Sequence, residues 1–187
     1  IDDPDNQPFA TDFIKEMIDF INVLIDKDAA YVANGNVLFR VKSFKNYGIL
    51  SERIIQEQDT GSRVDVETYK EDPNDFTLWK PSTDDEPGWD SPWGLGRPGW
   101  HLECSVMSEI VLGVPFDIHG GGNDLKFPHH DNEIAQTCAY HSNESAESFA
   151  KYWFHNGFLN LDNEKMSKSL GNVVYIDDLK KNFKGNE

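Results

Sequence analysis

The first regular pattern along the chain is an apolar stripe at helical spacing. The members of this stripe are Phe13, Met17, Ile18, Ile21, Leu24 and Ile25. They predict a helix that is capped by Thr11 and ends near Lys27. Two strand-like runs then flank Asn34 and Gly35, a residue pair that favours the tight I′ turn of a β-hairpin.

The second half of the chain alternates helices with short strands. The pattern predicts helices over residues 100–112, where Gly113 ends the helix, over 129–141, and after residue 172. Short strands are expected over 114–119 and 152–161, with a tight loop over 120–124 and a polar loop over 162–172. This alternation indicates an α/β fold whose ligand lies at the strand ends.

Two segments lack a clear period. Residues 48–71 are polar and charged, and we expect one short helix there, near Ser51. Residues 83–99 are rich in Asp, Pro, Gly and Trp, which predicts a loop and a boundary between lobes. We therefore expect one part over residues 1–82 and a second over 83–187.

Composition narrows the class of protein. At 187 residues the chain has the length of one domain, or of two small lobes that share a core. Its net charge of −16 excludes a protein that coats nucleic acid or anionic lipid with most of its surface. The sequence has no apolar run of membrane-spanning length and no signal-peptide pattern, so we expect no membrane partner. Cys104 and Cys138 are too few for a disulfide framework, so we expect reduced thiols and a cytoplasmic protein.

Three residues have the chemistry of metal ligands. His129 and Glu133 are four apart on a predicted helix, so both side chains project from one face. Cys104, on the preceding helix, can add a thiolate, and a sulfur, nitrogen and oxygen set suits zinc with an open fourth position. On spacing alone, a solvated helix face is the alternative interpretation.

Two further segments could bind phosphates or a nucleotide. Gly120 to Gly122 could let a nucleotide approach the backbone while Asp124 accepts hydrogen bonds from ribose, although a tight turn with an exposed Asp also fits. Lys165 and Lys168 lie among serines in a polar loop that could carry both ammonium groups to a polyphosphate. Alone, two such lysines also fit ordinary solvated charge.

Together these segments resemble one family. WDSPWGLGRPGWHLECSVM, FDIHGGGNDLKFPHHDNEIAQ and NEKMSKSLGN are similar, in order and spacing, to the cysteinyl-tRNA synthetases, which are class I aminoacyl-tRNA synthetases with a Rossmann-type catalytic domain. The hairpin and DFTLWK at 75–80 resemble the segment inserted between the two halves of that domain. The resemblance covers roughly residues 8–180. It implies an α/β fold in which residues 83–187 form the second Rossmann half and residues 1–82 belong to the insertion.

The resemblance also implies roles for individual residues. Three of the family's four zinc ligands correspond to Cys104, His129 and Glu133. The amino-acid pocket and its active-site histidines correspond to Trp100, His101, His119 and His130, with His119 a candidate catalytic residue. The ATP-contacting loop corresponds to Gly121 and Asp124. The mobile signature loop corresponds to Lys165 and Lys168, which are candidate catalytic residues; Lys168 is also a candidate ATP ligand. Two positions depart from the family pattern, with Val106 where alanine is usual and Asp131 where glutamate is usual.

The function implied is ATP-dependent activation of cysteine to cysteinyl-adenylate and transfer to tRNA(Cys), with one Zn²⁺ per chain and with Mg²⁺ accompanying ATP. The family's His-x-Gly-His motif, its fourth zinc ligand and its anticodon-binding domain do not occur in this sequence. We therefore expect a partial catalytic domain that is inactive alone. Two alternatives stay open: a mycothiol-pathway cysteine ligase with an amino-sugar acceptor, and a non-catalytic zinc-dependent binding or folding module.

Overall fold

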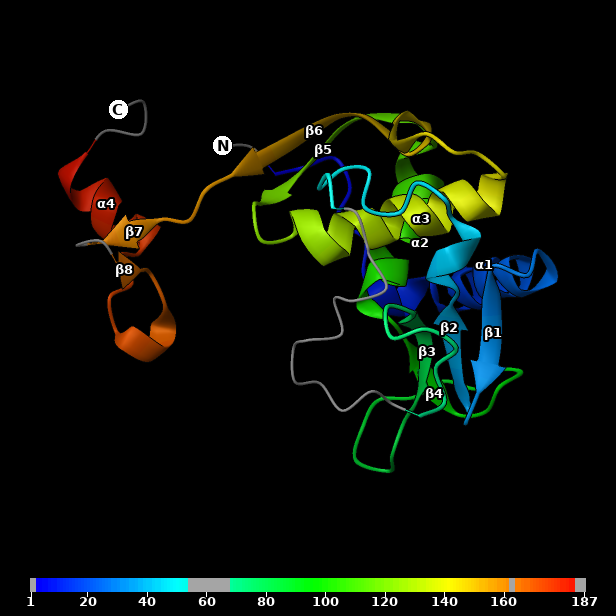
Figure 1. The fold of residues 1–187 in the computed structure, drawn as a ribbon. Coiled ribbons are helices and arrows are strands. Elements are labelled where there is room, and N and C mark those ends of the chain that lie inside the picture. Colours follow the sequence, from blue (N-terminus) through cyan, green and yellow to red (C-terminus); the bar gives the residue numbers. More distant parts are fainter. Residues whose placement is uncertain (1–2, 54–67, 162–163, 184–187) are drawn as a thin grey trace.

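The computed structural model describes residues 3–53, 68–161 and 164–183. Its α-helices are α1 (Ile14–Asp26), α2 (Trp100–Leu112), α3 (Asp131–His141) and α4 (Ile176–Asn182). Its strands are β1 (Ala30–Ala33), β2 (Asn36–Phe39), β3 (Phe76–Pro81), β4 (Gly96–Pro98), β5 (Phe116–Gly122), β6 (Ala150–Asn156), β7 (Asn160–Leu161) and β8 (Glu164–Lys165). Short helical turns are η1 (Ala10–Asp12), η2 (Val41–Ser43), η3 (Lys126–His130), η4 (Ala146–Ser148) and η5 (Lys168–Leu170). The mixed α/β class expected from the sequence is confirmed (Figure 1).

Helix α1 forms the centre of the core, as its apolar stripe predicts. Met17, Ile21 and Leu24 are fully buried, and α1 packs against β1, α2 and α3. The expected cap is wrong, because Thr11 lies in η1 and its side chain makes no cap hydrogen bond. The short turn η1 occupies the position where the cap was expected, and the regular helix begins only after Phe13.

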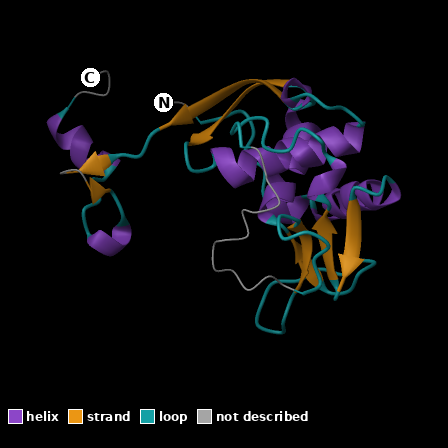
Figure 2. Ribbon diagram, in the orientation of Figure 1, coloured by secondary structure: helices purple, strands orange, loops and turns teal. Residues whose placement is uncertain are grey.

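Strands β1 to β4 form an antiparallel sheet in sequence order, beside the helices (Figure 2). The I′ hairpin is confirmed: Asn34 and Gly35 both have positive φ, at 48° and 76°. Asp75 fastens the hairpin to the segments around it. Its buried carboxylate accepts hydrogen bonds from the Val41 N–H at 2.9 Å, the Asp72 N–H at 3.0 Å and the Tyr31 hydroxyl at 2.7 Å.

The prediction of a loop over residues 83–99 is wrong for its last residues, because Gly96–Pro98 form β4 and pair with β3. Gly96 permits this pairing, because a side chain there would collide with the indole of Trp79. The sheet thus takes a strand from each side of the boundary expected at residue 82. The short helix expected near Ser51 is also wrong, since residues 45–52 form successive turns. Gly48 and Glu52 have φ of +85° and +60°, which a right-handed helix excludes. Residues 54–67 of that expectation lie outside the described residues.

Strands β5 and β6 form a parallel pair, and α3 lies in the crossover between them. The tight loop expected at residues 120–124 is wrong for Gly120 to Gly122. These glycines continue β5, because Phe154, His155 and Asn156 of β6 supply their pairing partners. The strand-like run expected over 152–161 is broken after Asn156 and resumes as β7.

The predictions for α2 and for a C-terminal helix agree with the structure. Helix α2 spans residues 100–112 and ends at Gly113, whose φ is +74°. The C-terminal helix is α4, which with β7 and β8 forms a small unit apart from the main body (Figure 1). Among the described residues, none of the helices has the length and apolar content that crossing a bilayer requires.

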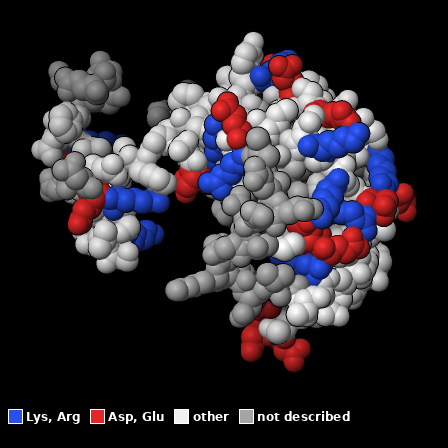
Figure 3. Space-filling view, viewed as in Figure 1, with Lys and Arg blue, Asp and Glu red and all other residues white. Residues whose placement is uncertain are grey.

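Charged side chains of both signs are interspersed on the face of the main body seen in Figure 3. Ion pairs of the described residues include Arg40 with Glu71 at 2.8 Å and Arg97 with Glu86 at 2.6 Å. On this face, positive charge does not predominate, as expected from the net charge.

Gly99 determines how closely α2 approaches the sheet, and it gives a test of the fold. Its N–H donates to the Leu78 carbonyl at 2.8 Å, and a side chain at this position would collide with the Thr77 carbonyl. We expect Gly99→Ala to lower the free energy of unfolding by roughly 1–3 kcal/mol, because α2 must move away from β3. The measurement is the urea unfolding midpoint. Gly157→Ala is the control, since no atom of the residues that the structure describes lies within 4 Å of its added carbon. Equal midpoints for the two variants would contradict the prediction.

Candidate metal centre

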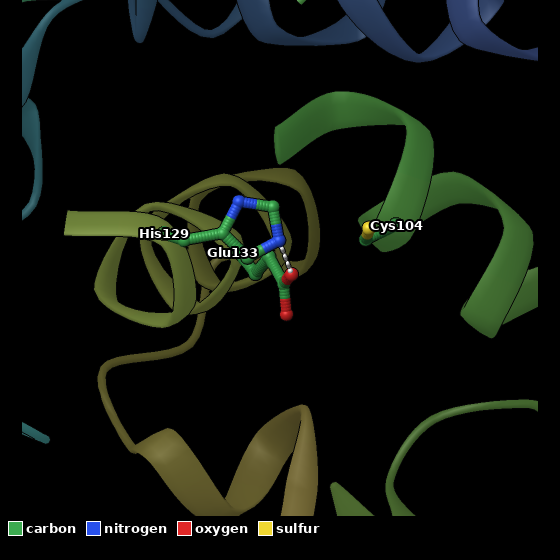
Figure 4. Close-up of side chains that lie close together, drawn as sticks. All are labelled: Cys104, His129 and Glu133. Carbon is green, nitrogen blue, oxygen red and sulfur yellow. Dashed lines mark ion pairs between the residues drawn. The ribbon is translucent and has the colours of Figure 1, made fainter. Parts of the chain in front are cut away.

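Helices α2 and α3 pack against each other and bring three side chains together. Cys104 comes from the second turn of α2, His129 from η3 and Glu133 from the first turn of α3. Their ligand atoms all lie within 4.8 Å of one another (Figure 4). The structure therefore unites the three residues whose chemistry suggested a metal site.

Glu133 lies at the centre of this cluster, and its side chain is fully buried. Oε1 is 2.6 Å from Nε2 of His129, and Oε2 is 2.8 Å from Nε2 of His119. Burial by itself raises the pKa of Glu133, but the hydrogen bonds from His119 and His129 outweigh it and lower the pKa to about 2. The residue is therefore a carboxylate at neutral pH.

The expected helix over residues 129–141 begins later than predicted. Phe127 has an extended backbone, with φ of −139° and ψ of 134°, so η3 is irregular and the regular helix begins at Asp131. His130 already has helical angles, with φ of −69° and ψ of −35°. His129 and Glu133 therefore still lie one turn apart on the same face.

Trp100 and His101 line the outer side of the cluster. Nδ1 of His101 is 2.7 Å from Nδ1 of His129, and the Trp100 ring lies 4.2 Å from the His129 ring, centroid to centroid. Burial, together with the smaller effect of neighbouring His129, lowers the pKa of His101 to about 4. Trp100 is 59% exposed, so its indole forms a rim that a ligand could contact.

His130 and His155 form the inner side of the cluster, and sequence reasoning missed His155. Nδ1 of His130 is 2.8 Å from Nε2 of His155. Burial lowers the pKa of His130 to about 4. Gly121 lies opposite His155 in the parallel pair, and a side chain at Gly121 would lie 2.9 Å from the His130 ring. Its absence leaves room for the imidazole. Trp153 and His155 are two residues apart on the predicted strand, so their side chains point to the same face. This spacing was the signal in the sequence that could have revealed His155.

A second group of ligand-type side chains overlaps the first. The ligand atoms of His119, His130 and Glu133 also lie within 4.8 Å of one another. The two groups share Glu133, whose oxygens face the two sides of the cluster.

The donor set of Cys104, His129 and Glu133 fits zinc. Within the described part of the chain, the buried oxygens of Glu133 have no hydrogen-bond partner apart from the two histidines. Two ligands of one tetrahedral zinc stand roughly 3.3 Å apart, so His129 and Glu133 would separate slightly on binding. Burial, together with nearby Glu133, raises the pKa of the Cys104 thiol to about 12, so a metal must displace a proton to bind there.

Of the residues proposed to bind phosphates or a nucleotide, Gly121 lies beside the His130 ring, whereas the two lysines lie elsewhere. Asp124 is exposed in the turn after β5. Lys165 is in β8, with Nζ 3.7 Å from the centroid of the Phe158 ring, and Lys168 is in η5. Both lysines belong to the C-terminal unit that Figure 1 draws apart from the main body.

Comparison with known proteins identifies one family model and several relatives that share a single name. A family model described as tRNA synthetases class I (C) catalytic domain matches residues 1–187. A cysteine–tRNA ligase of Jannaschia sp. (strain CCS1) is 56% identical over 177 residues, which are 95% of this chain and 38% of that protein. Proteins of the same name from Pelagibacter ubique (strain HTCC1062) and Maricaulis maris (strain MCS10) are 57% and 56% identical, over 99% and 97% of this chain. The chain spans about two fifths of the length of these relatives.

The lowered pKa values of His101 and His130, about 4 against 6.5, predict a pH dependence of stability. Folding keeps both rings neutral, so their contribution is complete above pH 6.5 and is lost as the pH falls toward 4. The contribution of Glu133 persists through this window, because it is lost only as the pH falls from 4.5 toward 2. As the pH falls from 6.5 to 4, we expect the metal-free protein to lose on the order of 2 kcal/mol of unfolding free energy because His130 becomes protonated. The loss from His101 should be smaller, because this residue is partly exposed.

Denaturant unfolding between pH 7 and 4, with a chelator present, measures this loss. His130→Gln should flatten the pH dependence, whereas His141→Gln, outside the cluster, should retain it. A stability that stays constant from pH 6.5 to 4.5 in the unmodified protein would contradict the interpretation.

Proposed function

The chain belongs to the class I (C) tRNA synthetase catalytic-domain family, and we propose on this basis that the intact protein is a cysteine–tRNA ligase. In the first step, the carboxylate of cysteine attacks the α-phosphate of ATP and pyrophosphate leaves. In the second, a hydroxyl of the terminal adenosine of tRNA(Cys) attacks the carbonyl and AMP leaves. The observation that carries the proposal is the convergence of Cys104, His129 and Glu133 beside the exposed ring of Trp100.

We propose that these three residues hold one Zn²⁺. A zinc ion there would prefer a soft thiolate to a hydroxyl, which supplies the discrimination between cysteine and serine. A contrast of this kind can be large enough to make editing unnecessary.

The protein groups around the metal centre have proposed roles in binding the amino acid. Trp100, His101 and His130 form the walls of the pocket. His130 and His101 remain neutral at physiological pH, because burial lowers their pKa, so they place no extra positive charge beside a bound ammonium group. His119 is proposed to act through its 2.8 Å contact with Glu133, which fixes the orientation of the carboxylate.

The proposed ATP side consists of Gly121, Asp124, Lys165 and Lys168, with Mg²⁺ accompanying the nucleotide. Gly121 and Asp124 lie at the carboxyl end of β5, the position at which parallel α/β sheets bind ligands. Because the two lysines lie on the C-terminal unit, we propose that this unit moves toward the pocket when ATP binds. Residues 83–187 are proposed to be the second Rossmann half, and residues 1–82 part of its insertion.

The acceptor is proposed to be tRNA, since the relatives described above are all named as tRNA ligases. The amino-sugar acceptor and the non-catalytic module gain no support from these relatives. We assign the protein to the cytoplasm, where its thiols stay reduced. Aminoacylation of tRNA(Cys) by the intact protein, with cysteine and with serine, tests the proposal.

The metal ligands give the first prediction from this function. Cys104→Ala and His129→Ala should each weaken zinc binding by about 100-fold or more, because each removes one of three protein ligands. Elemental analysis after dialysis measures the occupancy. Cys138→Ala is the matched control, since its buried thiol donates to the Ser145 carbonyl outside the cluster. Full occupancy in both ligand variants would exclude this site.

The signature loop gives the second prediction. Lys168→Ala should slow adenylate formation by about 100- to 1000-fold while cysteine binding stays unchanged, because its charge is needed only as pyrophosphate leaves. Pre-steady-state ATP–pyrophosphate kinetics measure the step. The control is Lys180→Ala on α4, an exposed lysine paired with Asp177. A normal rate of activation combined with weaker cysteine binding would reject the role.

A further inference from the structure

We infer that Asp131 is a positioning residue for the metal centre, acting by fastening a distant loop to the turn that carries His129. The inference rests on the proposed function, because it concerns the same site. Asp131 is the first residue of α3 and stands two residues from His129 and two from Glu133. A shift of the Asp131 backbone is therefore transmitted through two residues to His129 and through two residues to Glu133.

The carboxylate of Asp131 is almost completely buried, with 1% of the residue exposed, and it accepts two backbone hydrogen bonds. The Leu50 N–H donates to Oδ1 at 3.0 Å, and the Ser51 N–H donates to Oδ2 at 3.3 Å. A buried carboxylate needs such donors, and a buried N–H needs such an acceptor, so each side depends on the other. The negative charge also lies at the N-terminus of α3, where it is favourable.

Other side chains of the same loop hold the residues on both sides of Asp131. The Tyr47 hydroxyl donates to Oδ1 of Asn132, and the Tyr47 ring packs edge-on against Phe127 at 6.2 Å. The guanidinium of Arg53 lies 4.4 Å from the centroid of the Phe127 ring. Phe127 is the residue whose extended backbone makes η3 irregular, so the loop supports the least regular part of the site.

The loop can act as a support because it is closed on itself. Its Arg53 N–H donates to the Gly48 carbonyl at 3.2 Å. Gly48 has φ of +85°, and a side chain there would collide with the Arg53 carbonyl. This closure presents the Leu50 and Ser51 N–H groups side by side to a single carboxylate.

Asp75 provides a matched control for the experiment. It is also a carboxylate with 1% of the residue exposed, and it also accepts two backbone hydrogen bonds, from Val41 and Asp72. It supports the hairpin and its connection to β3, and neither of its backbone donors belongs to η3 or α3. Loss of either carboxylate should destabilise the fold, but only loss of Asp131 should disturb the metal centre.

The experiment measures metal binding in the intact protein, with zinc competed by a chelator and with cobalt as a spectroscopic substitute. We expect Asp131→Asn to weaken zinc binding by about tenfold and to change the visible cobalt spectrum, and Asp131→Glu to restore most of both. Asp75→Asn should lose unfolding free energy but keep the affinity and spectrum of the unmodified protein. Conditions are chosen so that every variant is folded.

Three outcomes would overturn the inference. The first is an unchanged zinc affinity and cobalt spectrum in Asp131→Asn, and the second is an equal change in Asp75→Asn. If Asp131→Asn does not fold, Tyr47→Phe is measured in its place. The third outcome is a zinc affinity of Tyr47→Phe equal to that of the unmodified protein. About threefold weaker binding would support the inference. Absence of zinc binding by the unmodified protein would overturn the proposed metal role as well, so the two failures are distinguishable.

Discussion

Glu133 is fully buried, and a buried carboxylate is tolerated only where hydrogen-bond donors surround it. This requirement determines the arrangement of the neighbouring elements. Strand β5 must bring His119 to one oxygen, and η3 must bring His129 to the other. A cluster of histidines around a single buried carboxylate follows from this arrangement, and it has the mixture of donors that a divalent cation needs. The same constraint explains why the site lies between α2 and α3 rather than in an open cleft.

Local patterns were sufficient for the elements that local interactions determine. The apolar stripe of α1 and the Asn34–Gly35 turn follow from periodicity and backbone preference, and both were predicted correctly. Helix α2 was also predicted with its bounds, because Gly113 ends it. The grouping of Cys104 with His129 and Glu133 needed more than spacing. Ligand chemistry suggested the group, and the resemblance to a family favoured it over the alternative, since a His and a Glu four residues apart also suit a solvated face.

Contacts between distant segments were not predictable in the same way. Gly96 looks like a loop residue until Trp79 lies beside it in the sheet, and Gly120 to Gly122 look like a turn until β6 pairs with them. The position of His155 in a predicted strand did not reveal its role, because that role depends on the register of β6 against β5. Asp131 likewise has no local pattern that reveals its partners at residues 50 and 51.

The parallel pairing of β5 with β6 has a consequence for the order of folding. Phe116 pairs with Ala150, and a long crossover separates them in the sequence. Closing this crossover costs chain entropy before the contacts between the two strands can offset the loss. The hairpin and α2 involve near neighbours and can form earlier. Because the histidine cluster needs β5, α3 and β6 together, we expect it to be completed late, after the folding barrier has been crossed. Substitutions within the cluster should then accelerate unfolding while leaving the folding rate almost unchanged, so the residence time of the native state depends on these side chains.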